Sequence, residues 1–350
     1  MGDTPGWETP EVRGPHPAAP LTGRGGGTGW SGRPPRGVIC SPEGRLPTIP
    51  KGSLMRTLDR EVIYYEFNRT HPARLTIDPG ETIEVVSEDA LSGQIRRPGD
   101  RRDKSKMPYS NPVTGPIAVR GAEPGDALAV TIERIEPAIG QCATYTGGAR
   151  QLSEWLGEGC PHGAHVCPIV DGEIHWSETI RIPYRPMLGC VGTAPDWGCP
   201  TTAPAGPHGG NLDLIEVCPG STVVLPVFVP GGHLYLGDAH AAQGHGELSA
   251  NGLEMPALST VRVELRKGAR PAWPRIETAT HIGCVASGSP MERSIPHAYA
   301  QLILWLEAEW GWDRWLAYDL LTHVGQISVG YHGIGTVLAK VERRYLTPPA

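Results

Sequence analysis

Short runs in which apolar and polar residues alternate dominate the chain, and this pattern predicts β-strands. Thr82–Ser87 and Val261–Leu265 alternate as half-buried strands do, because successive strand side chains point to opposite faces of a sheet. Turn-forming residues such as Asn111–Pro116 separate the runs, so the pattern favours a fold of many short strands. Further strands are expected within Val62–Tyr65, Ile117–Val119, Ala127–Ile132, Pro186–Pro195, Ser221–Pro230, Ile327–Val329 and Thr336–Val341.

Helical spacing is clearest late in the sequence. Apolar residues recur at helical intervals over Ile295–Trp310, which predicts an amphipathic helix. Ser294 is expected to cap this helix, Pro296 suits its first turn, and Gly311 is expected to end it. A second helix, turning back on the first, is expected over Asp313–His323.

Composition supports a mostly β fold, because glycine (46) and proline (36) are too abundant for long helices to dominate. Residues 1–51 are especially rich in both and poor in aliphatic residues. We therefore expect a disordered tail, which cannot bury enough apolar surface to offset its ordering entropy. Residues 52–350 are expected to form one domain, in which Gly140–Arg181 is irregular and lid-like.

Charge and cysteine usage narrow the class of protein. The formal net charge is -6 and no basic stripe is present, which argues against a nucleic-acid partner. The charged loop Arg96–Lys106 is interpreted as solvated, and no apolar run is long enough for a membrane span. Without a secretory signal or a C-x-x-C pair among the eight cysteines, we expect reduced thiols and a cytoplasmic protein.

Two polar clusters carry the candidate chemistry. Gly237–Glu247 holds acids, histidines and a carboxamide directly after a β-rich run, and Pro207–Asp213 places His208 and Asp213 beside glycines. If the chain stays extended from Gly237, the side chains of Asp238 and His240 share one face and can grip an ion or a polarised substrate. The remainder of the fold is expected to bring the two clusters together.

Structural roles remain open for each of these residues. His208 could cap a turn, Asp213 could be an ordinary turn residue, and Glu247 could lie on the surface. Asp238 and His240 could form a buried structural pair. A further donor set, Cys160, His162, His165 and Cys167, could bind a metal, but its spacing matches no zinc module and an exposed loop is the stronger interpretation.

These motifs together resemble the acetamidase/formamidase family. The resemblance covers roughly Thr57–Leu346 and implies a β-sandwich or jelly-roll-like body with intertwined halves and a small C-terminal helical pair. It further implies hydrolysis of small linear amides such as acetamide or formamide to a carboxylate and ammonia, with a divalent metal. The carrying motifs are Asn111–Pro116, Gly121–Asp126, His208–Asp213, Leu225–Pro230 and Gly237–Glu247.

Amide hydrolysis requires an activated water, stabilisation of the oxyanion and a proton for the leaving amine. The ligands expected for the metal, which is zinc or alternatively calcium or manganese, are His208, Asp213, Asp238 and His240. Glu247 is expected to carry the proton, and with Asp213 and Asp238 it forms the predicted catalytic set. Substrate-binding roles are expected for Gln94, Asn111, Asn211, Gln243 and His245.

One departure and two alternatives accompany this hypothesis. His245 stands where the family pattern has an acid, which puts substrate and metal identity in doubt. A non-catalytic metal- or ligand-binding module, or a hydrolase of another C–N bond such as that of a cyclic imide, would carry the same clusters. A homodimer or higher homo-oligomer is also expected, from the tryptophans of the helical pair, Trp305, Trp310, Trp312 and Trp315.

Overall fold

The computed structural model describes residues 55–107, 109–146, 150–159 and 163–347. The chain divides into two units, residues 1–38 and 39–350, and every described residue belongs to the second. The predicted tail, residues 1–51, and the donors Cys160 and His162 therefore lie outside the described residues. No helix in the described ranges is long and apolar enough to cross a membrane.

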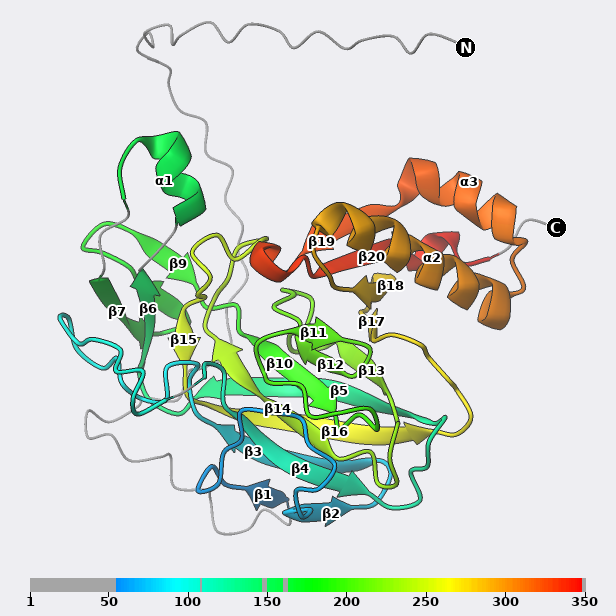
Figure 1. Ribbon diagram of the computed structural model, residues 1–350, viewed down its shortest axis with the longest axis horizontal. Coiled ribbons are helices and arrows are strands. Elements are labelled where there is room, and N and C mark those ends of the chain that lie inside the picture. Colours follow the sequence, from blue (N-terminus) through cyan, green and yellow to red (C-terminus); the bar gives the residue numbers. More distant parts are fainter. Residues whose placement is uncertain (1–54, 108, 147–149, 160–162, 348–350) are drawn as a thin grey trace, which may run out of the picture. The chain divides into compact units, whose positions relative to one another are not determined.

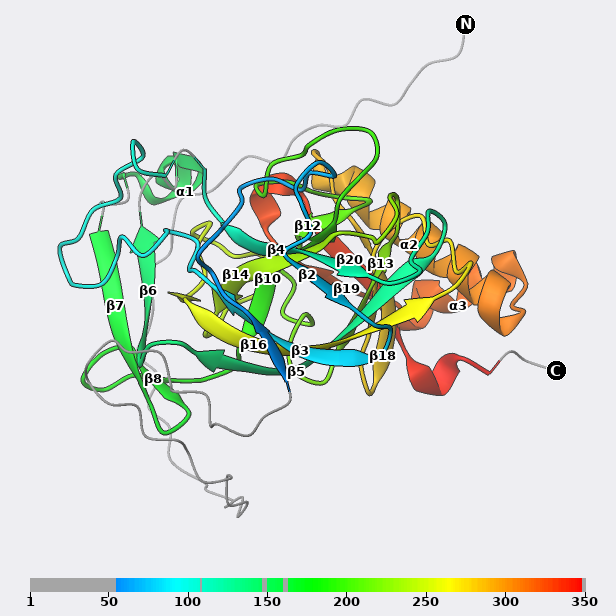
Figure 2. The ribbon, with the colours of Figure 1, turned by 90° about the horizontal axis from the view of Figure 1, so that it is seen from below.

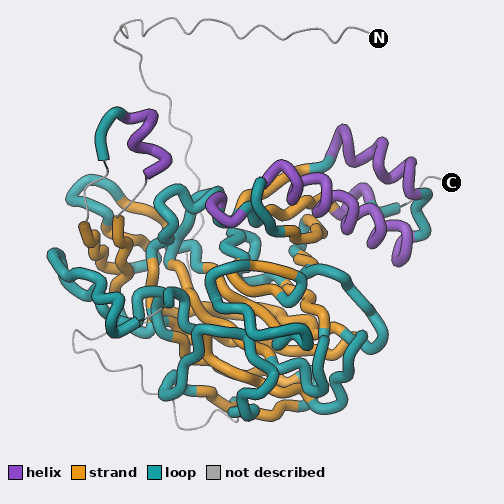
Figure 3. Tube along the Cα trace, in the orientation of Figure 1, coloured by secondary structure: helices purple, strands orange, loops and turns teal. Residues whose placement is uncertain are grey.

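Two sheets form the body, as predicted for a mostly β fold (Figures 1 and 3). The strands of the nine-stranded sheet are, in spatial order, β1 (Arg56–Leu58), β3 (Glu81–Ser87), β16 (Ala257–Arg266), β5 (Ala127–Pro137), β13 (Thr222–Pro226), β17 (Arg275–Glu277), β18 (His281–Ala286), β20 (Val337–Glu342) and β19 (Gln326–Val329). Since early, middle and late strands are neighbours here, the halves of the sequence are intertwined as the resemblance implied.

The eleven-stranded sheet holds the strands around the two polar clusters. Its main path is β11 (Ala205–Gly206), β12 (Gly209–Asn211), β10 (Met187–Thr193), β14 (Leu234–His240), β15 (Glu254–Met255), β6 (Gln141–Thr146), β7 (Gly163–Val170), β8 (Glu173–His175) and β9 (Arg181–Pro183). Off this path, β4 (Val113–Val119) pairs with β14 and with β2 (Leu75–Ile77). The central strand β14 is buried along its whole length.

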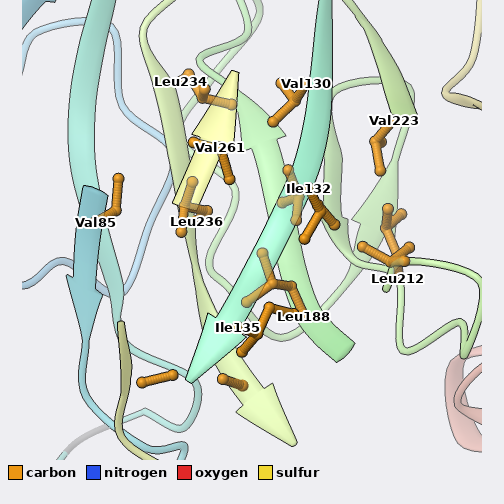
Figure 4. Close-up of a cluster of buried hydrophobic side chains, with 14 of the residues drawn as sticks. Val85, Val130, Ile132, Ile135, Leu188, Leu212, Val223, Leu234, Leu236 and Val261 are labelled. Carbon is orange, nitrogen blue, oxygen red and sulfur yellow. The ribbon is translucent and has the colours of Figure 1, made fainter. Parts of the chain in front are cut away.

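Apolar side chains from both sheets fill a common core. In β16 the alternation predicted from the sequence is observed, since Val261 and Val263 are buried while Arg262 and Glu264 are not. Figure 4 shows Val130 and Ile132 of β5 in the same cluster as Leu188, Leu234 and Leu236 of the other sheet. The core therefore fixes β10 and β14 against the nine-stranded sheet, and these two strands carry much of the site described below.

The helices lie at two separate places on the sheets (Figures 1 and 2). α2 packs Leu302, Trp305 and Leu306 against Ile282 and Val341 of β18 and β20. The helical elements are α1 (Arg150–Leu156), α2 (Met291–Trp310), α3 (Arg314–Val324) and the short 3-10 helices η1 (His332–Ile334) and η2 (Arg343–Tyr345). The predicted helical pair is confirmed, and Gly311 ends α2 with φ 68° in the left-handed region.

The start of α2 differs from the prediction. The helix begins at Met291, so Pro296 lies inside it and Ser294 is a helical residue rather than the cap. The Ser294 hydroxyl donates to the carbonyl of Gly288 at 3.0 Å, which anchors the first turn to the preceding loop. For α3, by contrast, the Asp313 side chain caps the helix and accepts from the backbone N–H groups of Trp315 and Leu316, a role that had not been predicted.

Three predictions of local structure, for one strand, one turn and one irregular segment, were wrong. Val62–Tyr65 forms no strand, and this segment reaches the sheet through an isolated bridge of Tyr64 to Val113. The expected turn Asn111–Pro116 already enters β4 at Val113. Gly140–Arg181 is not irregular, because β6 to β9 form a meander at the edge of the sheet. In each case the pairing partner is distant in sequence or the run lacks clear alternation.

The tryptophans that motivated the predicted oligomer lie at different depths. Trp305 and Trp312 are buried in the core of this chain's own helical pair, and Trp315 is exposed. Two of the four thus find their apolar environment within one chain. The oligomeric state stays a prediction.

Candidate active site

A glycine makes room for two carboxylates at the centre of the eleven-stranded sheet. In the antiparallel pair of β10 and β14, Leu188 lies opposite Ala239 and Cys190 opposite Gly237, so Gly189 faces Asp238. A Cβ at Gly189 would lie 2.5 Å from an oxygen of Asp238 and 2.5 Å from an oxygen of Asp213. A side chain at this position would therefore displace both carboxylates.

The same glycine holds the second polar cluster in place. β12 pairs with β10 on the side away from β14, and the chain then turns at Leu212 and Asp213. The backbone N–H groups of both residues donate to the carbonyl oxygen of Gly189, at 2.7 and 3.2 Å. Asp213 is thus fixed beside Asp238 by backbone bonds, and the expectation that the fold joins the two clusters is met.

The chain after β14 folds back to supply two more acids. β15 pairs with β14 so that Glu254 lies opposite His240. The intervening loop carries Glu247, which is buried, and the loop is tied down by the Gly246 N–H donating to Val329 of β19 at 2.9 Å. Asp213, Asp238, His240, Glu247 and Glu254 form what we call the acidic centre.

His240 contacts two acids of the acidic centre and one carboxamide. Its Nε2 lies 3.4 Å from an oxygen of Asp238 and 3.1 Å from an oxygen of Glu254. Its Nδ1 lies 2.7 Å from Oε1 of Gln243, whose amide nitrogen donates to the backbone carbonyl of Asp213. Because that oxygen can only accept, Nδ1 donates a proton to it, and Nε2 is left facing the oxygens of Asp238 and Glu254.

Burial and crowding give the acidic centre unusual proton affinities. Burial, with the charge of Asp213 beside it, raises the pKa of Glu247 to about 10, and burial beside Asp238 raises the pKa of Asp213 to about 8. Burial likewise raises the pKa of Glu254 to about 7. Burial alone would lower the pKa of His240, but the charges of Glu254 and Asp238 outweigh it and hold that pKa well above its usual value.

Four ionised acids would give the acidic centre more negative charge than its one imidazole can balance, which is why their pKa values are raised. A carboxyl oxygen of Asp213 and one of Glu247 lie within 4.8 Å of each other, so a proton on either group relieves the repulsion between them. One oxygen of Asp213 is buried without a hydrogen-bond partner, and an oxygen of Glu254 makes only the close approach to His240 without an aligned bond. Such groups are satisfied by protons or by a cation.

Two sets of donor atoms in the acidic centre are close enough to bind an ion. The ligand atoms of Asp213, His240 and Glu247 all lie within 4.8 Å of one another, as do those of Asp238, His240 and Glu254. Carboxylate oxygens and a neutral imidazole are ligands that zinc, manganese and calcium accept in different proportions. The residues present therefore fit a divalent metal.

Several residues of the site adopt a backbone conformation that L-residues rarely use. Positive φ angles occur at Asn111 (62°), Asp213 (47°), Asp238 (58°) and Glu247 (45°). Non-glycine residues with positive φ are uncommon and tend to gather at functional sites, since the surrounding structure must hold them there. Four such residues in and beside the acidic centre indicate that the fold holds their backbones in an unfavourable conformation and so positions their side chains.

A cavity of about 490 Å³ opens onto the acidic centre. Asp238, Glu247 and Glu254 lie in its wall, together with Asn111 and Asn211. The Asn111 amide donates to the side-chain oxygen of Asn211 at 3.0 Å, which also accepts from the Cys190 thiol at 3.1 Å. The two asparagines are thus held rigidly at the cavity wall, where the sequence had suggested substrate-binding groups.

Other predicted site residues lie elsewhere. His208 belongs to neither set of donor atoms. Its ring packs edge-on against Phe67 and Trp197, and burial lowers its pKa to about 4. Gln94 is bound to the backbone of Asp103. His245 is exposed and outside the cavity wall, because Gly244 and Gly246 turn the chain outward there.

Of the possible metal donors around Cys167, the two that the structure describes, His165 and Cys167, have separate surroundings. Cys167 is buried and lies opposite Cys142 in the pairing of β7 with β6. His165 instead packs on Trp176, whose carbonyl oxygen lies 2.7 Å from the His165 Nε2. These two donors therefore do not converge on a common ion.

Glu254 is the main residue that the sequence analysis missed. It is an acid within the otherwise apolar run Leu253–Ala257, and it is fully enclosed, with Oε1 accepting from the backbone of Gly252 at 2.8 Å. A charged residue inside an apolar run is the signal that could have identified it. Gln243, predicted to bind substrate, instead fixes the orientation of His240.

The fold and the acidic centre indicate the class of protein to which this chain belongs. A β-rich body with a buried carboxylate and imidazole centre below a cavity defines a class of protein able to bind a cation and a small polar ligand. The chain belongs to the acetamidase/formamidase family, whose model matches residues 57–200 and 197–284.

The similarity extends to solved structures and to curated proteins. An acetamidase structure from Yersinia enterocolitica has a TM-score of 0.78 and 32% identity, covering 87% of this chain and 96% of that one. The acetamidase of Mycolicibacterium smegmatis is 28% identical over 57% of this chain and 66% of its own length. The formamidase of Methylophilus methylotrophus is 25% identical over 57% of this chain and 64% of its own. The chain thus spans just under two thirds of the length of these curated relatives.

Proposed function

We propose that the protein is an amidase that hydrolyses a small linear amide to a carboxylate and ammonia at the acidic centre, with a divalent metal. The observation that carries the proposal is the group of four buried carboxyl groups around His240, three of which line a cavity of about 490 Å³. Family membership supports the reaction class, since the relatives are named acetamidase and formamidase.

The donor chemistry supports a metal with a mainly oxygen ligand set. Either Asp213, His240 and Glu247 or Asp238, His240 and Glu254 would hold it. His208 belongs to neither set, so one nitrogen donor remains where two had been expected. Zinc stays the first candidate, and the loss of one imidazole strengthens manganese and calcium. A bound divalent ion would lower the pKa of a water molecule and polarise an amide carbonyl.

The chain's own residues would orient the amide and move its protons. Asn111 and Asn211 present fixed amide groups to the cavity and can hydrogen-bond the planar substrate amide. Glu247 lies in the cavity wall, with a carboxyl oxygen within 4.8 Å of one of Asp213, so it can pass a proton from water to the departing nitrogen. Water adds to the carbonyl carbon, the C–N bond breaks, and the nitrogen leaves with the added proton as ammonia.

The test is ammonia release from acetamide and formamide by the full-length protein, with and without prior removal of metal by a chelator, alongside elemental analysis. We expect release that falls at least tenfold after chelation and returns when one metal is added back. Active protein that contains no metal would overturn the metal part of the proposal. Metal-containing protein with no turnover of either amide would favour a binding module or another C–N bond.

A further inference from the structure

Arg102 is a cation in the cavity wall that the proposed chemistry does not use. It belongs to the loop Arg96–Lys106, which the sequence alone assigned to solvent, yet its side chain is partly buried and lines the cavity. Its guanidinium donates to the Ser110 hydroxyl at 2.7 Å, and the carbonyl of Ser110 accepts from Thr202 at 2.9 Å. Ser110 precedes Asn111, so Arg102 is anchored to the same segment that supplies a substrate-binding amide.

No carboxylate pairs with Arg102 within the described residues. Arg96, at the start of the same loop, contrasts with it, since Arg96 forms ion pairs with Glu88 at 3.0 Å and with Asp89. The Nε of Arg102 is buried and has no hydrogen-bond partner there, and burial lowers the pKa of the guanidinium. A guanidinium that lines the cavity without a carboxylate partner leaves its positive charge available to an anion in the cavity.

The cavity is also larger than acetamide or formamide needs. One water takes up about 30 Å³ in the liquid, and acetamide is the size of a few waters, so it would fill only part of about 490 Å³. The wall carries apolar side chains, among them Leu91, Leu152 and Leu248. These surfaces suit an aliphatic segment between the amide and a second polar group.

We propose that the substrate is an amide whose far end is a carboxylate, with a short aliphatic spacer, and that Arg102 binds this carboxylate. The planar guanidinium can form paired hydrogen bonds with the substrate carboxylate. It also offers this carboxylate a positive charge, whereas the carboxylates of the acidic centre would repel it. The proposal rests on the proposed function for the amide end of the substrate. Arg102 is here a specificity-determining residue, because it contacts the substrate far from the bond that breaks.

The test compares two amides of matched shape on the full-length, metal-containing protein. Succinamate carries a carboxylate at its far end, and isocaproamide has two methyl groups where succinamate has carboxylate oxygens. Wild type should prefer succinamate in kcat/KM. Arg102→Gln should lower kcat/KM for succinamate about 10- to 100-fold, mainly through KM, and change that for isocaproamide less than threefold.

Two variants act as controls. Arg101→Gln removes the same charge from the exposed neighbouring residue and should alter neither substrate more than twofold. Arg102→Lys keeps the charge but not the planar fork and should fall between wild type and Arg102→Gln. An equal loss for both amides in Arg102→Gln, or a wild type with no preference for succinamate, would overturn the proposal.

Binding of succinate, followed by calorimetry, separates this inference from the proposed function. Succinate bound by wild type and at least tenfold more weakly by Arg102→Gln supports the anion site even if no amide is hydrolysed. Hydrolysis of acetamide together with succinate binding that is unchanged in Arg102→Gln keeps the amidase and rejects the anion site.

Discussion

Two buried groups of charged side chains begin three residues apart in the sequence and differ in their charge balance. In the acidic centre, four carboxylates surround one imidazole. At Glu216, one carboxylate oxygen accepts from Lys340 at 2.6 Å and from the Ser328 hydroxyl. The Glu216 group is neutral as a whole, whereas the acidic centre needs protons or a cation.

The difference shows that buried charged side chains can either stabilise the fold or form a reactive site. Glu216 ties the loop before β13 to β19 and β20, and its partners lower its pKa in spite of burial. The acidic centre is held together by backbone bonds and by glycines that leave space, although its charges repel one another. We therefore expect substitutions in the acidic centre to affect activity and substitutions at Glu216 to affect stability.

Asp213→Asn should have the largest effect on activity. We expect turnover to fall at least about 100-fold, because a charge at the reaction centre is lost, and metal content to fall with it. In chelator, the melting temperature should equal or exceed that of wild type, because burial raises the pKa of Asp213 to about 8 and the cost of keeping this carboxyl in the fold is removed. Ammonia release, elemental analysis and thermal unfolding measure the three quantities.

Asp126→Asn is the matched control for this variant. Asp126 is also buried, but Lys267 and the backbone of Gly268 and Glu123 satisfy its oxygens. This control should lose stability and keep its turnover per folded molecule. A melting temperature of Asp213→Asn several degrees below wild type in chelator would mean that the acidic centre is a structural cluster.

Gly189→Ala tests the space left for the carboxylates. The added methyl group would lie 2.5 Å from oxygens of both Asp213 and Asp238, so the acids must shift. We expect a loss of about 1–3 kcal/mol in unfolding free energy from overpacking and a loss of activity of at least tenfold. Gly198→Ala, where nothing lies within 4 Å of the added atom, should change neither urea unfolding nor turnover.

Glu216→Gln should reduce stability and leave the reaction intact. We expect a loss of about 1–3 kcal/mol at neutral pH, since Lys340 is left without its partner. The pKa of Glu216 is lowered in the folded state, so its contribution is present above the unfolded value of about 4.3 and is lost as pH falls through the folded value. The difference between wild type and variant in urea unfolding should therefore shrink below about pH 4.

A suitable control for that measurement is Glu342→Gln. Glu342 pairs with Arg344 at 2.8 Å near the surface, where such pairs contribute at most about 1 kcal/mol. A stability difference for Glu216→Gln that stays constant between pH 7 and about pH 3 would argue that its charge is unimportant.

His245→Asp should have the smallest effect. The substitution restores the acid that the family pattern has at this position, but His245 is exposed and lies outside the cavity wall. We expect kcat/KM for acetamide to change less than threefold and metal content to stay the same. A tenfold change in either would show that the loop brings residue 245 to the site.

Sequence patterns were sufficient to predict strands and helix ends that depend on residues close together in the sequence. Alternation identified β16 and β3, and Gly311 and Asp313 marked the boundary between the two helices. Val62–Tyr65 has strand-like composition but pairs only through isolated bridges. Strand formation there depends on a partner distant in sequence, which local composition does not specify.

Only the part of the acidic centre that lies within local motifs could be predicted from the sequence. Asp238 and His240 lie two residues apart on a strand, and the motif with Asp213 pointed to the second cluster. Glu254 reaches the centre through the pairing of β15 with β14, and His208 leaves it because its ring packs with Phe67. Both outcomes depend on how distant segments pack.

Apart from Leu248, the cavity-wall groups proposed to choose the substrate lie earlier in the chain than the groups of the proposed reaction. All five residues of the acidic centre lie between Asp213 and Glu254, whereas Arg102, Leu91 and Leu152 precede them. Mutations in the earlier stretch can therefore alter which molecule is accepted without touching the residues that break the bond. In evolutionary terms, the fold allows selection for a new substrate while the inherited chemistry is kept.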